Sequence, residues 1–216
     1  MATLNEITYN LALQVGKAED NVFLERVKFM VGYYRALLIR QDQLRNHSLP
    51  SHFIQAIDCL EMEASSAMEC CDAVDIGCDV WRTKRTIPRP VRLYDGSSFA
   101  YVGSVDGVTP YQQTTPIQVE YMQYSKYAGR GAQYVYRNDR IYVVNARPAK
   151  ILVRGIFERP EQLGDYLCCD GSPVFAEDKE YPVSMDMVQR ITQSILATEL
   201  SVQNPQDDHD EVQLNQ

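Results

Sequence analysis

Cysteine and histidine are the residues of this chain best suited to metal binding or nucleophilic catalysis. The six cysteines are Cys59, Cys70, Cys71, Cys78, Cys168 and Cys169. Their adjacent pairs and longer gaps do not reproduce the CxxC spacing of a zinc site. His47 and His52 stand on either side of Pro50 and cannot lie one turn apart on a helix. We therefore expect no metal site. Because no secretion signal is visible, we also expect reduced cysteines that pack as small hydrophobic residues.

Catalytic motifs are absent from the sequence. It contains no GxGxxG or GxxxxGK[ST] phosphate cradle, no GxSxG and no HExxH. Asp72, Asp75 and Asp79 lie close together without the ligand order of a calcium loop. No catalytic residue and no cofactor is predicted, so a structural or binding role is favoured. An enzyme with an unfamiliar site remains an alternative, and it would need a pocket where polar groups converge.

Positive charge is concentrated between Val80 and Leu93, a segment without any acidic residue. Its basic residues are Arg82, Lys84, Arg85, Arg89 and Arg92. Pro88 and Pro90 predict an extended edge strand or arm. One interpretation is contact with nucleic acid or with an acidic partner. The other is an edge strand protected by charge and proline against unwanted pairing. A continuous exposed patch would favour the first, and a split set paired with carboxylates the second.

Composition narrows the possible roles. The 216 residues are 45% hydrophobic and 23% charged, which is typical of a globular protein. The net charge is −8, and four acidic residues near the end, Asp207, Asp208, Asp210 and Glu211, supply half of it. The remainder is mildly acidic, which argues against a dedicated nucleic-acid binder. No run of 18 apolar residues is present, so we expect no membrane contact.

Two helices are predicted at the start of the chain. Thr3 and Glu6 form a capping-box pattern before a short helix, which Gly16 closes. A long helix then runs from Phe23 to Asn46, capped by Asp20 or Asn21. Because the connection is short, we expect the two helices to lie antiparallel as a hairpin over residues 1–48.

The long helix carries two apolar faces. Helical spacing places Phe23, Leu24, Val27, Met30, Val31, Tyr34, Leu37, Leu38 and Leu44 on the main face. A second line contains Phe29, Gly32, Ala36 and Ile39, with basic residues on both flanks. We expect contact on both sides, with a close approach at Gly32 and Ala36 by the preceding helix or by another subunit. The candidate subunit-interface residues are Phe29, Gly32, Tyr33, Arg35, Ala36 and Arg40.

A β-rich region is predicted over residues 52–160. Its clearest elements are a strand within Phe53–Met62, a hairpin from Ala132 to Val144 and a strand from Lys150 to Phe157. The segment Ile117–Tyr127 fits either a helix or a strand. Nine of the 14 tyrosines lie between Tyr94 and Tyr142. They can pack between strands, stack on bases or contact a protein partner.

The chain closes with a loop and a last helix over residues 161–203, which we expect to pack on the helical part. Ser184 is the predicted N-cap, and residues 204–216 form an acidic flexible tail. The predicted fold class is therefore α+β. It has an N-terminal helical hairpin and a C-terminal helix, with a mainly antiparallel sheet between them.

Five segments resemble the connector, or neck ring, proteins of short-tailed bacteriophages, in particular those of the crAss-like group. They are TLNEITYN, KFMVGYYRALLIRQDQLRN, YRNDRIYVVN, ILVRGIFERPEQL and YPVSMDMVQRITQSILATEL. The segments cover both ends and much of the middle, in order, and none is a catalytic motif.

This resemblance implies a non-enzymatic virion structural protein, made in the cytoplasm of the bacterial host. It implies a closed homo-oligomeric ring, commonly of twelve copies, that joins the portal to the tail. The ring would surround the DNA exit channel and contact the portal protein and other neck or tail ring proteins. The basic residues between Arg82 and Arg92 would then make transient contact with channel DNA or with a neighbouring component. The alternative is a nucleic-acid-binding accessory or regulatory phage protein.

Overall fold

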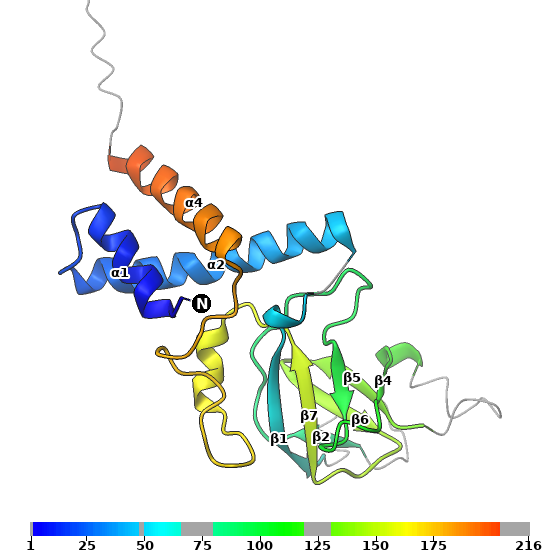
Figure 1. Ribbon diagram of the computed structural model, residues 1–216. Helices are drawn as coiled ribbons and strands as arrows, with labels where there is room; N and C mark the ends of the chain where they lie inside the picture. The colour runs from blue at the N-terminus through cyan, green and yellow to red at the C-terminus, as the bar shows by residue number, and fades with distance from the viewer. Residues whose placement is uncertain (1, 48–49, 66–79, 119–130, 204–216) are drawn as a thin grey trace, which may run out of the picture.

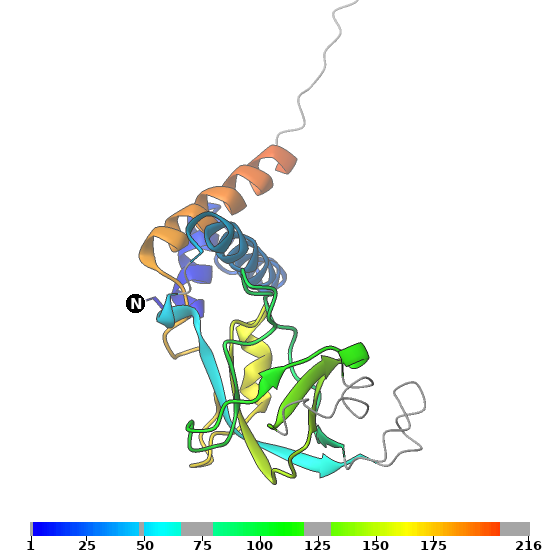
Figure 2. The ribbon, with the colours of Figure 1, turned by 90° about the vertical axis from the view of Figure 1, so that its right-hand side faces the viewer.

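The computed structural model describes residues 2–47, 50–65, 80–118 and 131–203. Three α-helices, α1 (Leu4–Gln14), α2 (Asn21–Asn46) and α4 (Met185–Gln203), form a helical part above a seven-stranded sheet (Figures 1 and 2). The predicted α+β class, with helices at both ends and a mostly antiparallel sheet between them, is confirmed. The predicted division into domains stays a prediction, and its acidic tail lies outside the described residues.

The predicted helix ends at the start of the chain are confirmed. Thr3 Oγ1 accepts a hydrogen bond from Glu6 N at 3.1 Å, and the Glu6 carboxylate accepts one from Thr3 N at 2.9 Å. Gly16, at φ 71°, follows α1 in the left-handed conformation that glycine adopts without strain. Asp20 Oδ1 accepts hydrogen bonds from the backbone N–H groups of Val22 and Phe23, which fixes the start of α2.

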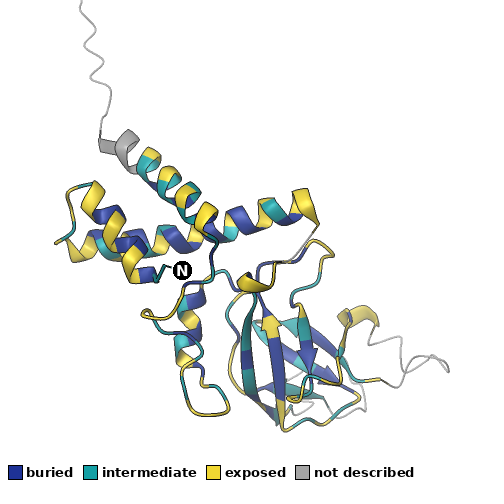
Figure 3. Ribbon diagram, in the orientation of Figure 1, coloured by how far each residue is buried: buried dark blue, intermediate teal, exposed yellow. Residues whose placement is uncertain are grey.

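The core of the helical part lies between α2 and the helices α1 and α4 (Figure 3). Its buried residues include Leu4, Ile7 and Leu11 of α1, Phe23, Val27, Val31 and Leu38 of α2, and Met187, Ile191 and Ile195 of α4. Two pairs show that α4 runs antiparallel to α2: Tyr34 with Thr198 at 2.9 Å, and Asp42 with Arg190 at 3.2 Å. The predicted main face of α2 is thus largely buried.

The sheet has the strand order β3-β7-β1-β2-β6-β5-β4. The strands are β1 (Gln55–Ala64), β2 (Trp81–Thr83), β3 (Tyr101–Gly103), β4 (Gln112–Gln113), β5 (Gln133–Arg137), β6 (Arg140–Val144) and β7 (Lys150–Gly155). All pairs are antiparallel except β4 with β5. The predicted hairpin is β5–β6, and both of its turn residues, Asn138 and Asp139, have positive φ, as a type I′ turn requires.

Hydrogen bonds between β3 and the segment just before β4 close this sheet into a small barrel. The segment that leads into β4 pairs with β3, through Tyr111 N to Val102 O at 2.7 Å and a bridge between Gly103 and Pro110. Gly103 is required at this contact, because a Cβ there would collide with the carbonyl oxygen of Thr109. The barrel interior is filled by buried side chains, including Ile57, Phe99, Val102, Ile141, Val143 and Val153.

The structure places the start of the basic segment but describes little of the tyrosine-rich segment. The edge position expected for the basic segment is wrong at β2, because Trp81–Thr83 pairs with β1 on one side and with β6 on the other. Pro88 and Pro90 follow β2 and interrupt no ladder within it. The tyrosine-rich segment Ile117–Tyr127 lies mostly outside the described residues, as do Asp72, Asp75 and three of the cysteines.

The expectation of reduced cysteines is wrong for Cys59 and Cys169, which form a disulfide with their Cα atoms 5.3 Å apart. Cys59 has φ 35° and lies where the pairing of β1 with β7 shifts register between Ile57 and Leu60. This irregularity turns Cys59 toward the loop that follows η2 (Pro160–Asp165), where Cys169 lies. Cys168 keeps a free, partly exposed thiol.

Candidate functional site

Arg35 joins the long helix to the rest of the molecule. Its side chain is fully buried between α2 and the segment from the end of β7 to the start of α4. Nε donates a hydrogen bond to Pro182 O and Nη1 donates one to Phe157 O, both at 2.8 Å. The guanidinium carbon also lies 5.7 Å from the centre of the Tyr181 ring, a cation–π contact. Arg35 therefore holds three separate segments of the chain together.

The groups around Arg35 stabilise its buried positive charge. Burial lowers the pKa of the guanidinium, while Tyr181 and Glu161 favour its charged form. The Tyr181 hydroxyl donates a hydrogen bond to Glu161 Oε1 at 3.0 Å. Burial raises the pKa of Tyr181 well above its ordinary value, so the phenol keeps its proton and remains a donor. Arg35, predicted as a subunit-interface residue, is therefore placed inside the chain, where no neighbour can reach it.

Gly32 packs against another part of the same chain, at ordinary contact distances. A Cβ at this position would lie 3.8 Å from Glu161 Oε1, 3.9 Å from Glu158 O and 4.0 Å from the Tyr181 hydroxyl. These groups come from the segment after β7 and from the segment that leads into α4. The preceding helix, α1, is not the partner at Gly32. Ile39, on the same line of the helix, is also buried.

The remaining predicted interface residues border an open groove on α2. Phe29, Tyr33 and Leu44 are exposed by 56%, 57% and 65%, and Leu37 is also exposed. The groove has a volume of about 480 Å³ and is also lined by Ala36, Arg40, Val91, Glu158 and Arg159. Leu37 and Leu44 belong to this groove, so their predicted place on the same face as the buried residues of α2 is wrong.

One side of the groove is polar and charged. The Arg159 guanidinium lies 4.8 Å from the centre of the Phe29 ring and covers part of it. Arg40 is exposed on α2, one turn beyond Ala36. An apolar strip bordered by arginines is typical of a protein-binding surface, because arginine and aromatic residues are both enriched at interfaces.

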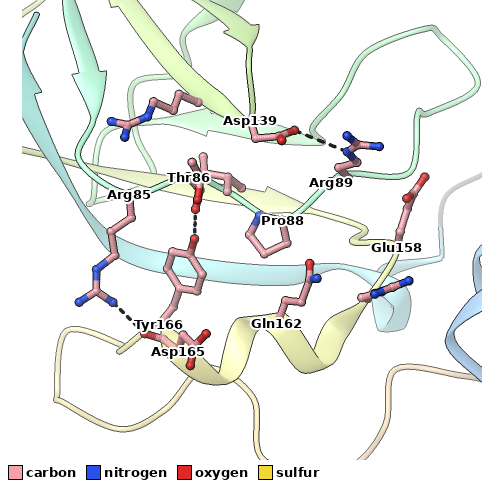
Figure 4. A pocket seen from close by; sticks show the side chains of 12 residues that line it. Arg85, Thr86, Pro88, Arg89, Asp139, Glu158, Gln162, Asp165 and Tyr166 are labelled. Atoms are coloured by element: carbon pink, nitrogen blue, oxygen red, sulfur yellow. Dashed lines mark hydrogen bonds and ion pairs between the residues drawn. The ribbon is translucent and has the colours of Figure 1, made fainter. Parts of the chain in front are cut away.

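A larger cleft adjoins the groove and shares Glu158 and Arg159 with it. The cleft has a volume of about 1,090 Å³ and lies between the β5–β6 turn, the segment 85–89 and η2 (Figure 4). Arg85 donates a hydrogen bond to Asp165 O at 2.9 Å, and Arg89 lies 3.8 Å from Asp139. Figure 4 shows these two pairs on opposite walls. Arg85 and Arg89 are thus each paired, at separate walls of the cleft.

The predicted basic segment is divided by these contacts. Arg82 pairs with Glu63 at 2.8 Å, Lys84 with Glu61 at 3.2 Å and Arg89 with Asp139 at 3.8 Å. Arg85 and Arg92 are exposed, with Arg85 bonded to a backbone oxygen. A split set paired with carboxylates is the arrangement that argues against a continuous nucleic-acid-binding patch.

Several residues of the groove and the cleft were not predicted from the sequence. Glu158 and Arg159 come from the loop after β7, and no periodic pattern marks them. The exposure of Leu37 and Leu44 could have been predicted. On a helix of 3.6 residues per turn, both point to a different side from Val31 and Leu38. In the described residues, no group of three metal-ligating side chains is present, and no helix is long and apolar enough to cross a membrane.

Comparison with known families identifies the family to which the chain belongs. A search of curated proteins found no match. The family model CrAss_Ring_2, described as phage tail ring protein 2, matches residues 6–216. The match covers nearly the whole chain, including both helical ends, the closed sheet and the segment that lines the groove. The chain therefore belongs to the phage tail ring protein 2 family, and it is a structural protein of the phage virion that assembles in rings.

Proposed function

We propose that this protein forms a closed homo-oligomeric ring in the neck of a crAss-like phage, between the portal and the tail, with the DNA exit channel through its centre. It is made in the cytoplasm of the bacterial host and acts without catalysis. Twelve copies is the number that the resemblance to phage connector proteins implies. The portal protein and other ring proteins of the neck or tail are its partners.

The observation that carries this proposal is the open apolar groove on α2. Phe29, Tyr33 and Leu44 expose more than half of their surface, along one face of a helix whose opposite face is packed in the core. A row of large exposed apolar side chains is a feature of interaction surfaces. In a ring protein, the first use of such a surface is contact between subunits.

The channel part of the proposal rests on the exposed members of the basic segment. Lys84, Arg85, Arg89 and Arg92 are exposed, although Lys84 and Arg89 each lie beside a carboxylate, while Arg82 is largely covered and paired with Glu63. We assign to these four residues transient contact with channel DNA, or with an acidic surface of the next component. Weak contact suits a channel, because DNA has to pass through it during ejection.

The mass of the purified protein in solution tests the ring. Light scattering would be measured on the protein alone and after mixing with a candidate portal protein. A large closed oligomer, or a monomer that assembles only on the portal, is the expected result. A stable monomer or dimer that does not bind the portal protein but binds DNA tightly would support the alternative, a nucleic-acid-binding accessory protein.

The DNA contact is tested separately. Changing Arg85, Arg89 and Arg92 to Ala should weaken DNA binding by the assembled ring. It should also lower the slope of log K against log salt by about 0.9 for each phosphate that the variant no longer neutralises. Lys150→Ala is the control, since Lys150 is exposed but lies outside the segment. Equal binding by the triple variant and the control would remove DNA contact from the proposal and leave the ring in place.

A further inference from the structure

The outer face of α1 is a second exposed apolar surface, separate from the α2 groove. Tyr9 and Leu13 are one turn apart and are exposed by 53% and 58%. They lie opposite the buried side of α1, which packs against α2 through Leu4, Ile7 and Leu11. The same side of α1 also exposes Asn5, Asn10 and Glu6, the only charged residue of this helix, so Tyr9 and Leu13 form a small apolar patch with a slight negative charge beside it.

The α1 of a chain cannot fill the groove of the same chain. Val27 and Val31 belong to the side of α2 that is buried in the helical core, whereas Phe29 and Tyr33 point to a different side. The groove and the outer face of α1 therefore belong to separate surfaces of one molecule. Two different surfaces that meet between copies make a head-to-tail contact, the type from which rings are built.

The outer face of α1 is short enough to lie within the groove, and the two surfaces differ in the sign of their excess charge. α1 has 11 residues, which corresponds to a length of about 16 Å. The groove extends from Phe29 to Leu44, about 22 Å along α2. The charged residues that line the groove are Arg40, Arg159 and Glu158, so positive charge is in excess there, and α1 carries Glu6 without any basic residue.

Pairing of two grooves with each other is less favourable. If two α2 helices met antiparallel around Tyr33, Arg26 of one copy would lie opposite Arg40 of the other, because each is seven residues from Tyr33. Opposed like charges destabilise such a pair. A symmetric contact of this kind would also stop at a dimer, whereas the family forms rings.

We propose that the α2 groove of one subunit receives the outer face of α1 of the next subunit, with Tyr9 and Leu13 packing among Phe29, Tyr33 and Leu37. The occupant is a second copy of this chain. This inference rests on the proposed function, since it names the partner of the groove and the direction of the ring.

Mixing two defective variants tests the inference. Tyr9→Arg places a charge in the outer face of α1 and leaves the groove unchanged. Tyr33→Arg places a charge in the groove and leaves α1 unchanged. Each variant alone should be monomeric under the condition in which the wild type assembles, with or without the portal protein. An equimolar mixture should give a complex of two chains and no larger one, because each end of that complex carries a spoiled surface. Val108→Arg, on an exposed turn of the barrel, should assemble like the wild type.

The outcomes separate the inference from the proposed function. Normal assembly by Tyr9→Arg would show that α1 is not the occupant, although the ring itself would stand. Two monomeric variants that fail to pair in the mixture would show that the two surfaces do not meet. A wild type that stays monomeric under both conditions would overturn the ring and the inference with it. Leu13→Glu and Leu37→Glu form a second pair, for use if circular dichroism shows that a first variant is unfolded.

Discussion

Replacement of Arg35 by Met should loosen the attachment of the long helix to the rest of the chain. Methionine keeps the aliphatic stem and the helix propensity of arginine. It removes the hydrogen bonds to Phe157 O and Pro182 O, each at 2.8 Å. Bonds to a charged group are worth about 1.5–3 kcal/mol each, so the gross loss is about 3–6 kcal/mol.

Part of that loss is offset, because a buried cation is costly in itself. Arg35 Nη2 is buried and has no hydrogen-bond partner, and removing the charge relieves this cost. We therefore expect a net decrease of about 3 kcal/mol in the free energy of unfolding. Arg40→Met is the matched control on the same helix. Because Arg40 is exposed, its replacement should change stability by less than about 0.5 kcal/mol.

The measurement is denaturant unfolding followed by circular dichroism, at a concentration where the chain is monomeric. The midpoint for Arg35→Met should be clearly lower than the midpoints of the wild type and of Arg40→Met. Near-equal midpoints for the two variants would refute the reasoning. Such a result would mean that the carbonyl groups of Phe157 and Pro182 find other partners, and that Arg35 does not hold the helix in place.

Two glycines and the disulfide give further predictions for the same unfolding assay. Gly32→Ala should stabilise the chain by about 0.5–1 kcal/mol, because alanine favours a helix and its Cβ finds ordinary contact distances of 3.8 Å or more. The same substitution at Gly103 should instead lower stability by about 1–3 kcal/mol, because its Cβ would collide with a backbone oxygen. Equal effects of the two substitutions on stability would contradict this account. Replacing Cys59 and Cys169 by Ser should lower stability by about 2–4 kcal/mol, because their bond closes a loop with a sequence separation of 110 residues. Reducing agent should then lower the midpoint of the wild type but not that of the double variant.

Local signals explain why the helix ends and the β5–β6 hairpin could be predicted from the sequence. Each depends on neighbouring residues, as with Thr3 and Glu6 in the capping box or Asn138 and Asp139 in the turn. Packing against Gly32 could also be predicted, because a small residue in an apolar line indicates that another group lies near the backbone. The partner was not readable, since Glu158 and Tyr181 are distant in sequence and only the fold brings them there.

Arg35 shows a different limit of the sequence. An arginine on the flank of an apolar stripe normally reaches solvent, so an interface was the natural interpretation. Its burial depends on backbone carbonyl groups of residues 157 and 182, which no side-chain pattern reveals. The disulfide could not be predicted from the sequence for a similar reason. Cys59 and Cys169 meet through a break in the β1–β7 register, and the spacing of cysteines does not encode that break.

The closure of the sheet has a consequence for folding at high concentration. Newly made copies of a virion protein crowd together before assembly, and a free strand edge would let sheets from different copies pair wrongly. Within the described part of the sheet, β3 and β4 are joined through the segment around Tyr111, which occupies the edge that another copy would need. In the proposed ring, the helical side of the molecule is then the surface that distinguishes correct from incorrect partners. Selection for faithful assembly should therefore act most strongly on the exposed side chains of α1 and α2.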